Sequence, residues 1–80
     1  MPQFYFDIND GKTRTIDRDG QDLPSFETAR DLAFQELAYI IRDEIPNGHI
    51  LSFVVTVRNE ANVPIYVAVS TLIGERLELA

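Results

Sequence analysis

Alternation of apolar and polar residues predicts four β-strands along the chain. In the first strand, Phe4, Phe6 and Ile8 fall on one side at a period of two, and Tyr5 and Asp7 fall on the other. The second segment is short and mostly polar, which favours a position at a sheet edge. The strands are expected at residues 3–8, 13–17, 50–58 and 63–73. In the two later strands, the residues expected to face the core are Leu51, Phe53, Val55, Val57, Ile65, Val67 and Val69.

A helix is predicted between the two pairs of strands. Ser25 follows a Leu-Pro pair and is a suitable N-cap, because its hydroxyl can accept a hydrogen bond from the first turn. The helix is expected over residues 26–44, before Pro46 and an Asn-Gly turn. Its apolar residues span an arc of roughly 140°, which is wide enough to cover a sheet. They are Phe26, Ala29, Ala33, Phe34, Leu37, Ile40 and Ile41.

The predicted order ββαββ indicates one domain over residues 1–80. The simplest packing is an α+β two-layer fold, a four-stranded antiparallel sheet with one helix across one face. The helical connection leaves the order of the strands open. Turns are expected at Asn9-Asp10-Gly11, at Asp17-Arg18-Asp19-Gly20 and at residues 59–62, because Asn, Asp and Gly tolerate the backbone angles of tight turns.

The sheet face opposite the helix is the surface to watch for a partner. Antiparallel sheets often leave such a face in contact with water. Asp7 and Arg58 are its only charged residues. The residues expected on this face are Tyr5, Asp7, Ser52, Val54, Thr56, Arg58, Tyr66, Ala68 and Ser70.

Two apolar groups are candidate interfaces. The first lies on the uncovered sheet face and consists of Tyr5, Val54, Tyr66 and Ala68. The second lies on one flank of the helix and consists of Leu32 and Tyr39, seven residues apart. Plain solvation and partner contact both fit these groups, since exposed apolar patches commonly mark interaction sites. A homodimer is the simplest partner that explains either group.

Charge and composition remove several classes of function. Seven Lys and Arg against thirteen Asp and Glu give a net charge of -6, which opposes binding to nucleic acids and to anionic membranes. The absence of cysteine excludes disulfides, thiolate zinc sites and cysteine nucleophiles. No stretch resembles a signal peptide or a membrane span, so a cytoplasmic location is expected.

No side-chain pattern predicts catalysis or a cofactor. The aspartates near the N-terminus do not match the spacing of a calcium loop, and turn chemistry explains them more simply. His49 lacks a second histidine, and Ser25, Ser52 and Ser70 lack a nucleophile elbow. We therefore assign no catalytic, metal-binding or cofactor-binding residue and expect no enzyme. The aspartates concerned are Asp7, Asp10, Asp17, Asp19 and Asp22.

Several segments together resemble a family of short bacterial proteins that is known only as a domain of unknown function. They are Phe4-Tyr5-Phe6-Asp7-Ile8-Asn9-Asp10-Gly11, Asp19-Gly20, Leu23-Pro24, Arg42-Asp43-Glu44-Ile45-Pro46 and Val57-Arg58-Asn59-Glu60. The likeness spans about residues 3–73 and implies a fold, with no catalytic residue to carry over. Asp10-Gly11, Leu23-Pro24 and the Ala-rich helix are also similar to antitoxin domains of the HicB type, without a DNA-binding segment.

These observations favour a small non-enzymatic protein-interaction domain that forms a homodimer. The alternative is an antitoxin-like regulator that binds a basic protein, because the acidic surplus complements such a partner.

Overall fold

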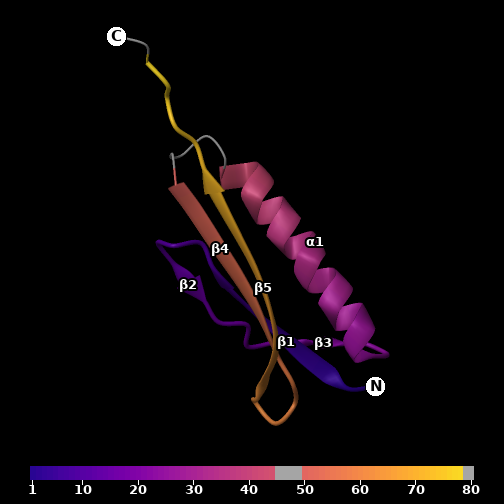
Figure 1. Cartoon of the computed structure of the whole chain (residues 1–80). Helices are drawn as coiled ribbons and strands as arrows, with labels where there is room; N and C mark the ends of the chain where they lie inside the picture. The colour runs from indigo at the N-terminus through magenta and orange to yellow at the C-terminus, as the bar shows by residue number, and fades with distance from the viewer. Residues whose placement is uncertain (45–49, 79–80) are drawn as a thin grey trace.

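The computed structural model describes residues 1–44 and 50–78. Across these residues the fold is of the α+β class, as predicted, with one helix packed against an antiparallel sheet of five strands (Figure 1). The elements in chain order are β1 (Gln3–Asn9), β2 (Arg14–Thr15), β3 (Gln21–Asp22), α1 (Phe26–Glu44), β4 (Ile50–Arg58) and β5 (Pro64–Ile73).

The predicted strand at residues 13–17 is shorter than expected and is followed by a strand that was not predicted. Only β2 forms in this segment, and β3 pairs with β1 farther along, opposite Gln3 and Phe4. Between β2 and β3 the chain leaves the sheet, because the side chain of Asp17 takes the place of the next backbone hydrogen bond to β1. Its Oδ2 accepts a hydrogen bond from the backbone N–H of Phe6 at 3.1 Å. The sheet therefore has five strands instead of four.

Helix α1 covers residues 26–44, as predicted. Ser25 caps it, since its Oγ accepts a hydrogen bond from the backbone N–H of Thr28 at 3.2 Å. Ala29 and Ala33 on the inner face have no exposed surface, so the helix lies close to the sheet. The helix packs mainly over β4 and β5.

The strand order is β2-β1-β4-β5, which places β4 in the centre and β5 at an edge. The chain folds this way because β4 carries the largest completely buried side chains of the described core. They are Phe53, Val55 and Val57, as predicted. The side chain of Leu51 lies outside the described residues.

The face assignment of β5 is wrong in the sequence-based prediction. Ala68 is 3% exposed and pairs with buried Val55, and Tyr66 packs against the core. Apolar residues occur at both the odd-numbered and the even-numbered positions of β5, so alternation alone does not decide which set faces the helix. The small side chain of Ala68 matches the close approach of α1. The residues that were expected inside and are exposed are Ile65 (37%), Val67 (54%) and Val69 (58%).

One flank of the predicted helix arc is also more exposed than expected. Phe26 is 38% and Phe34 is 54% exposed. Their rings meet Tyr66 edge to face, with centroid distances of 5.8 and 6.1 Å. Because β5 is an edge strand, no described strand lies beyond it to cover these rings. Leu32, which was expected outside the arc, packs against the core instead.

Candidate functional site

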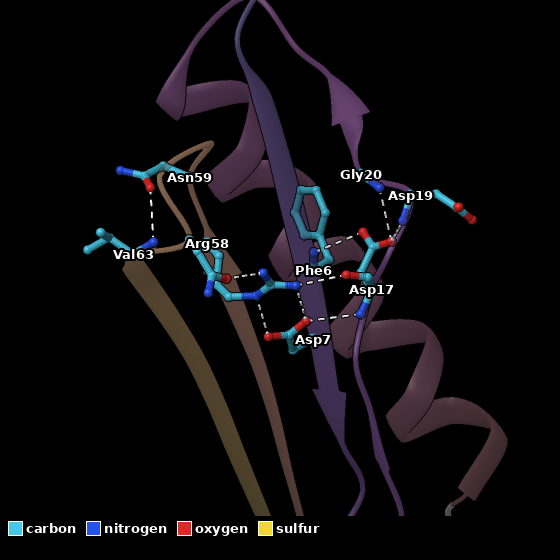
Figure 2. Close-up of polar contacts among 9 residues, drawn as sticks. Phe6, Asp7, Asp17, Asp19, Gly20, Arg58, Asn59 and Val63 are labelled. Carbon is cyan, nitrogen blue, oxygen red and sulfur yellow. Dashed lines mark hydrogen bonds and ion pairs between the residues drawn. The ribbon is translucent and has the colours of Figure 1, made fainter.

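A charged cluster lies on the side of the sheet opposite the helix (Figure 2). Arg58 of β4 meets Asp7 of β1 through two hydrogen bonds, from Nε to Oδ2 at 2.7 Å and from Nη2 to Oδ1 at 3.0 Å. The side chains are 16% and 9% exposed, so this ion pair is largely shielded from water. A bidentate pair of this kind fixes the position of both side chains.

The loop between β2 and β3 is attached to this ion pair. Arg58 Nη2 also donates to the carbonyl oxygen of Asp17 at 2.8 Å, and the N–H of Asp17 donates to Asp7 Oδ1 at 3.0 Å. The Asp17 carboxylate in turn accepts hydrogen bonds from the N–H groups of Asp19 and Gly20. Figure 2 shows these contacts converging from β1, β4 and the loop. The cluster therefore holds the loop against the sheet.

The electrostatics of the cluster favour its ionised form. Burial by itself would raise the pKa of Asp7, but hydrogen bonds from Arg58 and from the Asp17 N–H outweigh it and lower that pKa. Burial opposes ionisation of Asp17 in the same way, and the N–H groups of Gly20, Phe6 and Asp19 lower its pKa. The hydrogen bond to Asp7 raises the pKa of Arg58. All three groups are charged at neutral pH.

An open hollow of about 440 Å³ borders the cluster. Tyr5 forms one wall, and the Arg58 guanidinium lies 5.0 Å from the centre of its ring. Arg58 already donates to Asp7, Asp17 and Asn62. Four of its five N–H groups thus donate within the protein, and the arrangement supports the fold more directly than it supports chemistry. The hollow is lined by Tyr5, Ile16, Asp17, Arg18, Arg58, Glu60 and Asn62.

Turn chemistry accounts for Asp10 at the first turn, as predicted. Asp10 Oδ1 accepts hydrogen bonds from the N–H groups of Lys12 and Thr13, at 2.9 and 2.7 Å. Asn9 Oδ1 accepts one from Gly11, which has a φ of 88°. Among the residues that the structure describes, no three His, Cys, Asp or Glu side chains are grouped so that they could hold a metal ion.

The serines are spread over the fold. Ser25 caps α1, and Ser52 on β4 shares a hydrogen bond of 3.2 Å with Thr71 on β5. Ser70 pairs with Phe53 on the helix side of the sheet. His49 lies outside the described residues.

An exposed apolar strip follows β5 on the side of the sheet opposite the helix. Val69 pairs with Val54 of β4, and Val67 pairs with Thr56. We call Val54, Ile65, Val67 and Val69 the apolar strip. Sequence reasoning named only Val54 among them, because it placed the other three in the core. Apolar residues occur at both odd-numbered and even-numbered positions of β5, and only one of these two sets can face the helix. This pattern was the available signal that the other set would be exposed.

The predicted interface residues lie in different surroundings. Tyr5 and Val54 are half-buried on the outer face, as expected. Tyr66 and Ala68 lie on the helix side, so they do not belong to an outer patch. Tyr39 is 62% exposed, whereas Leu32 packs against the core, so the helix does not present them as a pair.

The fold and the site define a small α+β domain whose open sheet is locked on one side by an ion pair and left apolar along its β5 edge. The chain belongs to the family described as domain of unknown function DUF6894, whose model matches residues 3–71. No curated protein and no solved structure matches the chain. Within residues 1–44 and 50–78, the helix is too polar to cross a membrane.

Proposed function

We propose that the chain is a non-enzymatic protein-interaction domain that acts as a homodimer. The observation that carries this proposal is the apolar strip, whose three β5 members are between 37% and 58% exposed. Exposed apolar residues that lie side by side are costly to hydrate and commonly mark association surfaces. The charged cluster supports the non-enzymatic part, since Asp7, Asp17 and Arg58 already bind one another.

Sedimentation equilibrium tests the homodimer directly. One chain has a mass of 9.1 kDa, so we expect about twice that mass at micromolar concentrations. Val69→Lys is expected to shift the equilibrium to the monomer, because it places a charge in the strip. Thr13→Lys is the matched control, since Thr13 is exposed beside β2 at the other edge of the sheet. A wild-type chain of 9.1 kDa at high micromolar concentration would contradict the proposal.

A basic protein partner is the second candidate, as for an antitoxin-like regulator. The observation in its favour is the acidic helix surface, where Glu27, Asp31, Glu36 and Asp43 are exposed. Such binding should weaken as salt screens the charges. Titration with polylysine, in wild type and in Glu27→Gln with Glu36→Gln, tests it. Salt-insensitive or charge-independent binding would count against this candidate.

A further inference from the structure

The outer edge of β5 has no strand beside it in the described part of the chain. β5 runs for ten residues and pairs with β4 on its inner side. In an antiparallel pair, alternate residues direct their N–H and C=O groups away from the partner strand. Half of the β5 residues therefore direct their N–H and C=O groups away from β4, along the plane of the sheet. Such an edge is a ready template for another strand, and many proteins block it with charges or prolines.

The β5 edge carries little of that protection. The segment Pro64–Ile73 contains no charged residue in a chain whose net charge is -6, and its one proline is its first residue. A second copy would meet strong like-charge repulsion over much of the surface but none along this strand. The composition of the edge therefore favours a second copy of the same chain.

Apolar side chains flank the edge on both sides of the sheet. On the outer side lie the members of the apolar strip that belong to β5. On the helix side lies the Phe34 ring, 54% exposed and in contact with Tyr66 of β5. Figure 1 shows α1 running beside β5 along most of the strand. An added strand would cover apolar surface on both sides at once.

The rest of the outer sheet face is poorly suited to stacking of two sheets. Beyond Val54 it carries Thr56, the Asp7–Arg58 pair and the loop that this pair holds. Desolvating this charged region would be costly. The apolar surface is thus confined to a band at the β5 edge, which fits edge pairing better than face stacking.

We propose, building on the homodimer proposed above, that two copies join antiparallel through β5 into one continuous sheet. A two-fold axis perpendicular to the sheet places both helices on the same side, so that the two Phe34 rings approach across the junction. Two residues that stand opposite each other in an antiparallel pair lie on the same face of the sheet. The two-fold axis must therefore pass between one residue of β5 and the same residue of the second copy. The residues nearest the middle of the strand are Ala68 and Val69.

The size of this junction depends on the length of β5 and on the helix beside it. Because one residue stands opposite its own copy, nine of the ten β5 residues pair, and they extend over about 31 Å at roughly 3.4 Å per residue. With side chains about 5 Å deep on each face, half the ~10 Å spacing of stacked sheets, the strand edge alone covers roughly 300 Å² per copy. The helix flank around Phe34 has to add to this area to approach the ~800 Å² of a standard interface.

Amide hydrogen exchange of the wild-type chain provides the first test. Edge pairing gives the outward N–H groups of β5 new partners, so alternate β5 amides should exchange more slowly as protein concentration rises. Face stacking adds no backbone bonds. A dimer without concentration-dependent protection in β5 would overturn the edge pairing and leave the homodimer standing. A chain that sediments as a monomer would overturn both.

Two substitutions separate the helix side from the outer face. Phe34→Glu should weaken the dimer at least about ten-fold, as for a central interface aromatic, whereas Val54→Lys on β4 should change it less than about three-fold. Both side chains are partly exposed, and circular dichroism checks that each variant folds. The reverse order of effects would favour face stacking and overturn this proposal.

Cross-linking tests the register without relying on a destabilised variant. The natural chain has no cysteine, so a single introduced thiol is unambiguous. Val69→Cys should form covalent dimers with a short bifunctional thiol-reactive reagent, because residue 69 lies opposite or diagonal to its copy. Arg14→Cys, at the β2 edge, should remain monomeric. Equal cross-linking of both variants would contradict the proposed junction.

Discussion

Arg58 and Asp7 lie 51 residues apart in the chain and form a bidentate ion pair on the sheet face away from the helix. The pair connects β1 to β4, and through Asp17 it also fixes the loop between β2 and β3. This one contact therefore couples three segments of the fold, on the side that the helix does not cover.

Asp7→Asn should destabilise the protein markedly. The amide leaves the Arg58 charge, which is only 16% exposed, without its counter-ion and weakens the attachment of Asp17. Breaking a shielded ion pair from one side costs about 3 kcal/mol. Urea unfolding measures the loss. Asp19→Asn is the matched control, because Asp19 is exposed, and it should change the stability by less than about 0.5 kcal/mol. Equal effects of the two substitutions would show that the ion pair contributes little.

The same cluster predicts a loss of stability in acid. The pKa values of Asp7 and Asp17 are lowered by folding from an ordinary value of 3.8, so the unfolded chain binds protons more readily than the folded one. Their contribution is complete above that value and is lost as the pH falls through the lowered pKa values. Urea midpoints between pH 2 and pH 7 should show this decline. Asp7→Asn should show a shallower decline, and a parallel curve would contradict the assignment to Asp7.

A side chain at position 20 should destabilise the protein. The φ of Gly20 is 71°, and a Cβ atom there would lie 2.8 Å from Cε1 of Tyr5. We expect Gly20→Ala to lower the free energy of unfolding by about 2 kcal/mol, part from the left-handed backbone and part from the displaced ring. Gly11→Ala carries the backbone cost alone, because its nearest contact is an ordinary 3.5 Å. Gly74→Ala, in open space, should be neutral in thermal melts. Similar losses at Gly20 and Gly11 would mean that the ring moves aside freely.

Lysine substitutions at two neighbouring residues test which face of β5 packs against the helix. Ala68→Lys places a charge in the core beside Val55 and should cost more than about 3 kcal/mol. Val67→Lys faces outward, where Val67 is already 54% exposed, and should cost less than about 1 kcal/mol. Urea unfolding of both variants at the same low concentration measures the difference. The opposite ranking would restore the orientation predicted from alternation.

Local chemistry made several parts of the fold predictable. The helix bounds followed from Ser25, the apolar period and Pro46. The inner face of β4 was predictable because its apolar residues alternate with polar ones at Ser52, Thr56 and Arg58. The Asp10 turn was predictable because a short carboxylate binds the N–H groups that directly follow it.

The candidate sites were predictable only in part. Sequence reasoning identified Asp7 and Arg58 as the charged residues of the outer face, but not that they bind each other and Asp17. That contact depends on the adjacency of β1 and β4, which the helical connection left open. The apolar residues of β5 were assigned to the wrong faces because both faces of that strand carry apolar side chains.

The sequence by itself determined the α+β class, the helix, the longer strands and the turns, since these depend on contacts between near neighbours in the chain. Only the tertiary structure decided the strand order, the division of the β2–β3 segment and the face that β5 presents to the helix. Each of these depends on a long-range contact: β1 beside β4, Asp17 on the backbone of Phe6, and Ala68 beneath α1. Hydrophobic alternation fixes which residues share a face, but the packing partner decides which face is buried.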